Sequence, residues 1–465
     1  MEDEQGLFEK AITFADIIAG SAKENENILI ASHHDADGIC SSAIISQLIL
    51  KNGGHCQIRS VSEPNSRFLD KLYSSKFDLI IFLDICGGLS GEVAKRFGDK
   101  WLIIDHHEIN TDELESDRVL NSWQFGIDGT SSISTAGLCH YIGKSNLDRS
   151  AFLAIVGALS DRQDVGPRRS LVGLNAKIIE ADSLGRKSIS SKVDMLLWSR
   201  ETKPIHESLA STLSVHIPGL TGNKDACLAS LRSAGIEIKA STRWKTVGEL
   251  SEDEKQRLIE TITPHLSGTT YTVEDLVGTL YSQSEKDEYS SMRDARDLAT
   301  VLSACGRVGK AGAGIAMCLG ESPNITNEVE QAYSDYRSEI LRSLQALTSN
   351  EDRIAEKGEC ILVTADGLVG ERLTGAICQI LASYARFKQK VVFVRTTTSD
   401  GDVKISVRAG RDRSDFNLGK IISEIASVAS GVGGGFRNAA GARFPIAKQQ
   451  EFQQAVDSKF QKKLR

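Results

Sequence analysis

Four apolar segments of this chain are each followed within two residues by an aspartate or a histidine. They are Ile28–Ala31, Leu79–Leu83, Trp101–Ile104 and Ala151–Ser160. All four resemble buried strands, and ligands of parallel α/β sheets lie beyond the carboxyl ends of the strands. The pattern therefore predicts one metal-rich site. Its side chains are those that follow the four segments: His33, His34, Asp35, Asp37, Asp84, Asp105, His106, His107 and Asp161.

Helical periodicity marks other parts of the chain. Apolar residues recur every three or four positions over 7–25 and over 328–352, and we predict an amphipathic helix at the first and one long helix at the second. A helix is also expected near 66–77, and residues 170–320 read as mainly helical. The tail alternates strand and helix patterns: strands Cys360–Thr364, Val391–Arg395 and Val403–Arg408, and a helix Leu373–Ala385.

These elements predict an α/β protein. A parallel-sheet N-terminal lobe carries the site, a smaller α/β C-terminal lobe follows, and the long helix joins the two. We place the domain boundaries at 1–190, 191–290, 291–350 and 351–465.

The amino-acid composition indicates in which cellular compartment the protein is expected. The 465 residues include 25% charged and 40% hydrophobic residues, an ordinary balance for a soluble globular protein. No apolar run approaches the roughly 20 residues of a membrane span, and the acidic start lacks a signal-peptide pattern. Nine scattered cysteines without a C-x-x-C pair favour reduced thiols. We therefore expect a cytoplasmic protein that does not bind membranes.

Charge is distributed unevenly along the chain. Residues 401–465 contain twelve Lys and Arg against six Asp and Glu, a net of +6, which leaves −13 for the first 400 residues of a chain whose total is −7. A basic tail region beside an acidic, metal-holding part suits a polyanionic substrate. A solvated basic C-terminus explains the charge equally well.

The most informative polar cluster is His33-His34-Asp35-Ala36-Asp37-Gly38. In an extended H-x-D-x-D segment His33, Asp35 and Asp37 point the same way and can converge on one metal ion or a pair. Gly38 would then turn the chain into a helix starting near Ser41. Clustered acids at a turn are also commonplace without any metal. Two adjacent histidines after a buried strand, by contrast, have few structural uses.

Two glycine-rich stretches are candidates for anion binding. Gly431–Gly441 is flanked by Arg437 and Arg443, and its backbone N–H groups can approach an anion closely; a tight turn before a helix is the alternative. Gly309–Gly314 is better explained by close helix packing than by phosphate binding.

Together these motifs resemble the DHH phosphoesterase superfamily, whose pattern is a DxD motif, an isolated Asp, Asp-His-His and a further Asp, in this order. The segments "SHHDADG" and "LSACGRVGKAGAGIAMCLGE" are similar to archaeal RecJ-like single-strand exonucleases, a branch related to a eukaryotic replicative-helicase subunit. The glycine run resembles the GGGH-x-x-A-A-G motif of the DHH-associated domain, with Phe436 in place of its histidine. Residues 190–290 contribute least to the resemblance.

The resemblance implies a site with two divalent cations, Mn²⁺ preferred and Mg²⁺ as the alternative. Asp35 and His33 would hold one cation. Asp37, His106 and Asp161 would hold the other, with Asp84 bridging. His107 would serve the substrate phosphate, and Asp105 would orient a histidine. The residues expected to bind substrate are Arg307, Arg408, Gly433, Gly434, Gly435, Phe436 and Arg437.

The function implied is an exonuclease that acts at an end of single-stranded DNA or RNA, in repair or replication. Within the same superfamily, a phosphodiesterase for short oligonucleotides or cyclic dinucleotides is the alternative. A non-catalytic replisome scaffold that binds GINS-like partners is the alternative from another class.

Overall fold

The computed structural model describes residues 2–62, 64–73, 76–108, 116–143, 147, 149–284, 290, 292–320, 322–413 and 416–461. The chain folds into two compact units. Unit 1 comprises Met1–Leu196 and Val277–Tyr336, and unit 2 comprises Leu197–Leu276 and Arg337–Arg465. Among the described helices none combines the length and the apolar character that a membrane crossing requires.

Unit 1 is built on a five-stranded parallel sheet of order β2-β1-β3-β4-β5. Its strands are β1 (Ile28–His33), β2 (Cys56–Val61), β3 (Leu79–Leu83), β4 (Trp101–Asp105) and β5 (Val119–Asn121). Every residue of β3 and β4 is buried, as expected of strands covered on both faces. The predicted parallel sheet is confirmed, and its strand ends align along one edge.

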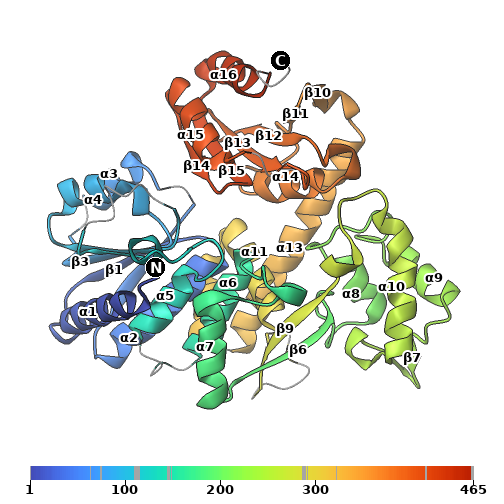
Figure 1. Cartoon of the computed structure of the whole chain (residues 1–465), viewed down its shortest axis with the longest axis horizontal. Helices are drawn as coiled ribbons and strands as arrows, with labels where there is room; N and C mark the ends of the chain where they lie inside the picture. Colours follow the sequence, from blue (N-terminus) through green and yellow to red (C-terminus); the bar gives the residue numbers. More distant parts are fainter. Residues whose placement is uncertain are drawn as a thin grey trace. The chain divides into compact units, whose positions relative to one another are not determined.

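Helices cover both faces of this sheet (Figure 1). On one face α3 (Ser66–Tyr73) and α4 (Ser90–Phe97) pack on a core that includes Leu29, Phe82 and Ile103. On the other face lie α1 (Glu4–Lys23), α2 (Ala36–Lys51) and α5 (Thr135–Ile142). The remaining elements of unit 1 are α6 (Ser150–Ser160), α7 (Gly173–Leu184), β6 (Ile189–Met195), β9 (Val277–Gln283), α11 (Ala295–Arg307) and α12 (Ala311–Leu319).

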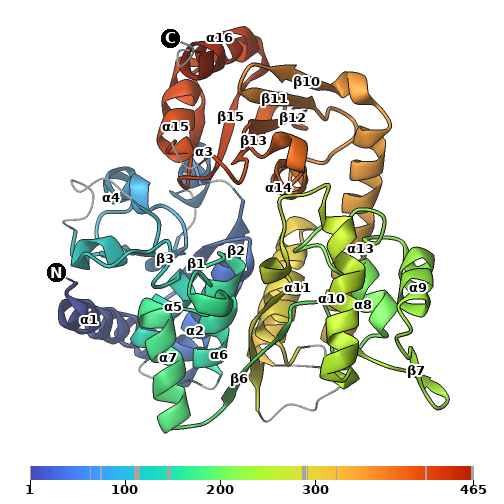
Figure 2. The same cartoon turned by 45° about the vertical axis from the view of Figure 1, so that its right-hand side comes forward.

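Unit 2 contains a six-stranded mixed sheet of order β10-β11-β12-β13-β15-β14 (Figure 2). Its strands are β10 (Ile354–Lys357), β11 (Cys360–Thr364), β12 (Val391–Thr397), β13 (Asp402–Ala409), β14 (Val432–Gly435) and β15 (Ala439–Pro445). Helix α14 (Thr374–Ala382) packs on one face, and α15 (Leu418–Val428) and α16 (Gln449–Gln461) pack on the other. The rest of unit 2 comprises α8 (Ile205–Ser211), α9 (Lys224–Ser233), β7 (Lys239–Ala240), β8 (Arg243–Trp244) and α10 (Glu252–Leu266).

The predicted long helix is α13 (Pro323–Thr348), which begins in unit 1 and ends in unit 2. Strands β12 and β13 pair in antiparallel register as a hairpin.

Three expectations about local structure are wrong. Residues Ser150–Ser160 form helix α6 and not a strand, because the nine-residue apolar run Ala151–Leu159 is long for a strand and is rich in Ala and Leu, which favour helices. The helix expected near Ser41 starts at Ala36. The stretch 170–320 contains helices α7 to α12 but is not helical throughout, because it also contains strands β6 and β9, which pair in antiparallel register.

Candidate metal centre

The segment after β1 turns directly into helix α2. Asp35 is the N-cap, and its carboxylate accepts a hydrogen bond from Gly38 N at 3.2 Å. Asp37 therefore lies in the first helical turn and is fully buried. Gly38 lies inside the first turn of α2, so the expectation that it turns the chain into the helix is wrong. A side chain at this position would collide with the backbone of His33, which explains the glycine.

Asp37 is held by the start of helix α5. Its two carboxylate oxygens accept hydrogen bonds from Thr135 N at 2.8 Å and Ala136 N at 2.9 Å. These are N–H groups that the helix itself leaves without partners. Helix α6 approaches from the other side at Gly157, where an added Cβ would overlap Asp37 Oδ1 and lie 2.7 Å from the Cβ of Ala136. The carboxylate is thus fixed in position by two helices.

Asp84 lies at the centre of the cluster. It follows β3 with a left-handed backbone (φ 62°), unusual for a residue other than glycine. Its Oδ2 is 3.4 Å from His33 Nδ1, and its Oδ1 is 3.4 Å from His106 Nε2. Thr135 Oγ1 donates to the same Oδ1 at 3.2 Å. The two oxygens of this one carboxylate therefore face two different groups of side chains.

The two histidines after β4 face different partners. His106 is buried, with Nδ1 2.6 Å from Gly129 O and Nε2 3.2 Å from Asp161 Oδ2. The side chain of His107 is 36% exposed, and its Nδ1 lies 2.7 Å from Asp105 Oδ1. Asp105 in turn accepts hydrogen bonds from Gly87 N and His107 N. His106 therefore points into the carboxylate cluster, whereas His107 is oriented by Asp105.

Three groups of side chains could each bind a metal ion. In each group the three residues offer one ligand atom apiece, and these atoms lie within 4.8 Å of one another. They are His33, Asp35 and Asp84; Asp37, His106 and Asp161; and Asp84, His106 and His107. All six side chains expected to bind metal thus come together. Asp161 follows the C-terminal end of helix α6. Its carboxylate therefore reaches the cluster although the preceding segment is a helix and not the expected strand.

The charges of the cluster are poorly compensated by the protein alone. Burial, and then the charges of Asp161 and Asp84, raise the pKa of Asp37 well above its usual range. Burial also raises the pKa of Asp161, against the opposing hydrogen bond to His106. Burial lowers the pKa of His106, but its contacts with Asp161 and Asp84 outweigh that effect and hold the pKa well above its usual value. Oxygen and imidazole donors crowded in this way fit divalent cations.

His107 and Asp105 behave as a separate pair. Burial raises the pKa of Asp105, but the charge of His107 and its hydrogen bond outweigh burial and lower it to about 2. Asp105 correspondingly raises the pKa of His107, against the lowering effect of burial. A charged Asp105 therefore favours the protonated form of His107.

Several residues that support the site were not found from the sequence. Asn121 Nδ2 and Trp123 Nε1 donate to the carbonyls of His107 and His106, each at 3.0 Å. Gly129 packs so closely on His106 O that any side chain would collide. Single polar residues and glycines of this kind carry no periodic signal; only Ser134-Thr135, a helix-start pattern, could have been recognised.

Comparison with known proteins identifies the domains. Residues 27–157 match the N-terminal domain of the DHH family, residues 197–277 the DHH-CID domain and residues 360–462 the DHHA1 domain. The order of these domains agrees with the resemblance of the metal-site motifs. The chain belongs to the DHH superfamily.

Relatives of this DHH protein share its whole length. An uncharacterized protein of Methanocaldococcus jannaschii is 26% identical over 451 residues, 94% of each chain. The structure is similar to that of CDC45 from Entamoeba histolytica, with a TM-score of 0.65, 13% identity and 98% and 99% of the two chains covered. It is also similar to RecJ from Thermus thermophilus in complex with Mn²⁺, with a TM-score of 0.57, 15% identity, and coverage of 98% of this chain and 55% of that chain. These likenesses establish a shared fold.

The residues expected to bind substrate fall in both units. Arg307 ends helix α11 in unit 1, where its guanidinium lies 5.7 Å from the centre of the Tyr336 ring. The preceding residue, Gly306, packs on the backbone of His34, and any side chain there would collide with it. Arg307 is therefore one residue from a contact with the segment that carries His33 and Asp35. Gly314 packs on Leu302 and Ile39, which confirms the helix-packing interpretation of Gly309–Gly314.

In the DHHA1 domain the glycine run is not a turn before a helix but strand β14, which pairs with β15 in a hairpin. Phe436 and Arg437 lie in the turn of this hairpin. Their carbonyls accept hydrogen bonds from Gly419 N at 3.0 Å and Leu418 N at 2.9 Å, at the start of α15. The side chain of Arg437 is exposed and that of Phe436 is half-buried. Arg408, on β13, donates to Val407 O at 2.9 Å.

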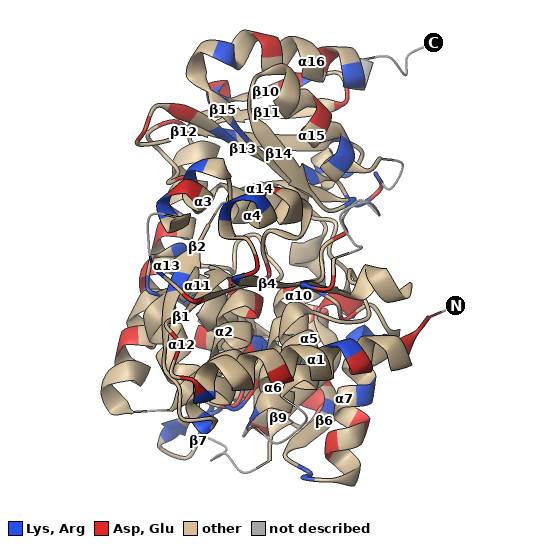
Figure 3. Cartoon of the chain, turned by 90° about the vertical axis from the view of Figure 1, so that its left-hand side faces the viewer, with Lys and Arg blue, Asp and Glu red and all other residues tan. Residues whose placement is uncertain are grey.

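Several arginines of residues 401–465 that the structure describes form ion pairs within unit 2. Arg443, which flanks the glycine run, donates from Nε to Asp402 at 3.0 Å and also pairs with Asp400. Arg411 pairs with Asp275 and Arg413 with Glu359. Helix α16 carries both charges along its length (Figure 3). Of the two arginines beside the glycine run, Arg443 is thus the one whose guanidinium is held by Asp402 and Asp400.

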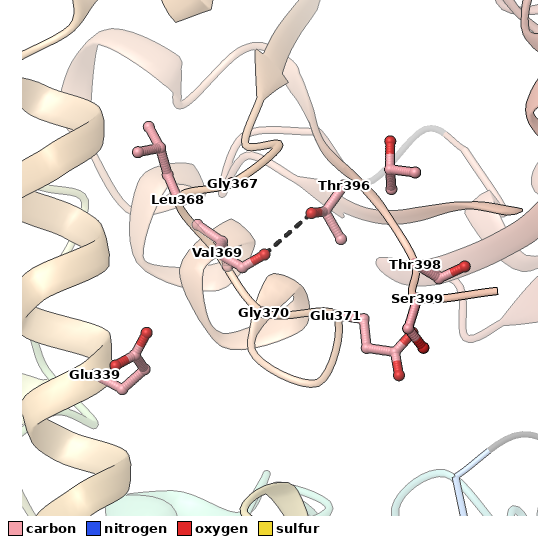
Figure 4. A pocket seen from close by; sticks show the side chains of 10 residues that line it. Glu339, Gly367, Leu368, Val369, Gly370, Glu371, Thr396, Thr398 and Ser399 are labelled. Atoms are coloured by element: carbon pink, nitrogen blue, oxygen red, sulfur yellow. Dashed lines mark hydrogen bonds between the residues drawn. The ribbon is translucent and has the colours of Figure 1, made fainter. Parts of the chain in front are cut away.

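Unit 2 also contains a cavity of about 390 Å³ (Figure 4). It is lined by Glu339 of α13, the loop Gly367–Glu371 and the end of β12, where Thr396 Oγ1 donates to Val369 O at 3.0 Å. The carboxylates of Glu339 and Glu371 make this cavity unsuited to a phosphate.

Proposed function

We propose that this protein is a metal-dependent exonuclease that hydrolyses phosphodiester bonds at an end of single-stranded DNA or RNA. The observation that carries the proposal is the position of Asp84. One of its oxygens faces His33 and the other faces His106, which is how a carboxylate shared by two cations must point. A cluster serving only stability would not need the buried carboxylates of Asp37 and Asp84 beside the partly buried Asp161, since their charges oppose one another.

The ligand assignment follows the geometry. Asp35 and His33 would bind one cation, Asp37, His106 and Asp161 the other, and Asp84 both. Two divalent cations held by these residues would supply an activated water molecule and would stabilise the charge on the phosphodiester oxygens. Imidazole donors favour Mn²⁺ over Mg²⁺, and the similar RecJ structure from Thermus thermophilus is a complex with Mn²⁺.

His107 would act on the substrate and not on a cation. Its Nδ1 is engaged by Asp105 at 2.7 Å, which leaves Nε2 as the atom to meet a phosphate oxygen. Asp105 raises the pKa of His107, which favours the protonated imidazole that would donate to that oxygen or to the leaving group. Asp105 is the positioning residue of this pair.

The DHHA1 hairpin would hold the nucleic acid. Phenylalanine cannot donate the hydrogen bond that the family's usual histidine offers, but Phe436 can stack on a base. Arg437 can supply a charged fork toward phosphate. Arg408 and the backbone of Gly433–Gly435 would contribute further contacts.

The test is digestion of end-labelled single-stranded DNA and RNA oligomers with Mn²⁺, Mg²⁺ or EDTA, with Asp84→Asn as the inactive control. We expect stepwise shortening from one end with Mn²⁺ and none with EDTA. The label position then gives the polarity. Cleavage confined to dinucleotides or cyclic dinucleotides would instead favour a small-substrate phosphodiesterase. A protein that binds Mn²⁺ but cleaves nothing would favour the scaffold alternative.

A further inference from the structure

We propose that Gln163 is a positioning residue of the metal centre, which fixes His106 and the start of helix α5 through one side chain. This inference rests on the proposed function for the role of His106 as a metal ligand. Gln163 lies two residues after Asp161 and has no exposed surface. Its Nε2 donates to Gly129 O at 2.9 Å and to Ile133 O at 3.1 Å. Its Oε1 accepts from Asn175 Nδ2 at 2.7 Å.

The first consequence concerns the ring of His106. A carbonyl oxygen can only accept, and Gly129 O lies 2.6 Å from His106 Nδ1, so Nδ1 must carry the hydrogen. This places the lone pair of a neutral ring on Nε2, which faces Asp161 and Asp84. Metal binding requires this tautomer. Gln163 Nε2 lies 3.4 Å from His106 Nδ1, so both donors converge on the same carbonyl oxygen.

The second consequence concerns Asp37. Ile133, the other carbonyl that Gln163 holds, lies two residues before the N–H group of Thr135 that binds Asp37 at 2.8 Å. The same Thr135 donates its hydroxyl to Asp84. Gln163 therefore holds both ends of the loop 129–133, one end supporting His106 and the other supporting Asp37 and Asp84.

A buried glutamine that satisfies two carbonyls would also contribute to folding without serving the metals. The next residue offers a matched control. Asp164 is buried as well, but its carboxylate pairs with Arg169 at 2.8 Å and with Arg296 at 2.7 Å. Its ion pairs join the same segment to Arg169 and to Arg296 in the first turn of α11, and neither partner lies in the loop 129–133.

The experiment compares Gln163→Met, Asp164→Asn and wild-type protein in Mn²⁺ titrations by calorimetry, with melting temperatures measured in EDTA. We expect Gln163→Met to bind one Mn²⁺ about 10–100-fold more weakly. Asp164→Asn should lower the melting temperature while keeping both affinities. Asn175→Ala removes the hydrogen bond to Gln163 Oε1 and should weaken Mn²⁺ binding by a smaller factor. If Gln163→Met does not fold, the Mn²⁺ affinity of Asn175→Ala tests the role of Gln163 instead.

Wild-type affinities in Gln163→Met, or in Asn175→Ala where only that variant folds, would overturn this inference alone. Equal weakening in Asp164→Asn would also overturn it, since any damage to the segment would then suffice. Failure of the wild-type protein to bind Mn²⁺ would overturn the proposed function together with this inference.

Discussion

The edge of the unit 1 sheet and the DHHA1 hairpin of unit 2 are both expected to bind phosphate groups, but they are built in opposite ways. At the sheet edge, buried carboxylates and imidazoles from β1, β3, β4 and helix α6 crowd together, so that burial and neighbouring charges displace the pKa of Asp37. In the hairpin, glycine backbone and an exposed Arg437 face outward, and Arg443 is engaged by Asp400 and Asp402.

The difference shows what kind of residue pattern is informative. Burying several like charges together costs free energy unless cations compensate them, so such a cluster indicates a metal site. The indication did not depend on whether the segment before Asp161 was a strand or a helix. Glycines and surface arginines serve turns and ion pairs as readily as they serve ligands. The assignment of the sheet edge therefore depends on few assumptions, whereas that of the hairpin depends on Phe436 and Arg437 alone.

The largest effect should come from removing the shared carboxylate. Asp84→Ala should lower hydrolysis by at least about a hundredfold, because both cations lose a ligand. The matched control is Asp78→Ala, just before the other end of the same strand, whose carboxylate accepts hydrogen bonds from Asn27 and pairs with Lys100 at 3.8 Å, away from the cluster. Initial rates on a labelled oligomer measure both. An Asp84→Ala variant that keeps more than about a tenth of the rate would exclude a two-cation site.

Removing His107 should separate chemistry from metal binding. His107→Ala should lose about 10²–10⁴-fold in kcat, the range for a general acid, and keep the wild-type number of bound Mn²⁺ ions. Kinetics and calorimetry on one preparation give both quantities. If one Mn²⁺ is lost with the imidazole, His107 is a ligand and its assignment to the substrate is wrong.

A smaller disturbance is expected from filling the space beside Asp37. The Cβ of Gly157→Ala would displace the Asp37 carboxylate, and we expect roughly tenfold weaker Mn²⁺ binding by analogy with other supporting residues. Gly20→Ala in helix α1 is the control. No atom lies within 4 Å of the added methyl, so Mn²⁺ binding should not change and helix propensity should add up to about 1 kcal/mol of stability. Equal Mn²⁺ affinities in the two variants would contradict the packing argument.

Mn²⁺ binding should weaken as the pH falls. Burial and neighbouring charges raise the pKa of Asp37 and of Asp161, and the pKa of His106 is raised by its carboxylate partners. The metal-free site thus holds protons that a cation must displace, and the number released grows as the pH is lowered. Titrations in two buffers of different ionisation enthalpy count these protons. Affinity that does not change with pH would contradict the raised pKa values.

The smallest and most selective effects belong to the hairpin. Phe436→Ala should weaken binding of single-stranded nucleic acid by roughly 1–3 kcal/mol per stacked base, with little change in melting temperature. Arg437→Ala should weaken binding and flatten its salt dependence. Arg443→Ala, whose guanidinium is held in ion pairs, should leave the salt dependence unchanged. A Phe436→Ala variant that melts earlier but binds normally would place Phe436 in the core.

Part of unit 1 could be predicted from the sequence because strands β1, β3 and β4 are short, mainly apolar runs that lead into aspartate or histidine residues. Two kinds of feature could not. Helix α6 is apolar all round because it is buried on all sides, so no amphipathic period distinguishes it from a strand. Gln163, Gly129 and Gly157 act through tertiary contacts 23–120 residues away in the chain, which no local pattern encodes.

The central claim is that Asp84 is shared by two cations at the edge of the unit 1 sheet. Crystals grown with Mn²⁺ and measured at the manganese absorption edge test it directly. We predict two anomalous peaks roughly 3.5–4 Å apart, with one oxygen of Asp84 toward each. A single peak, or two peaks of which only one contacts Asp84, would contradict the account.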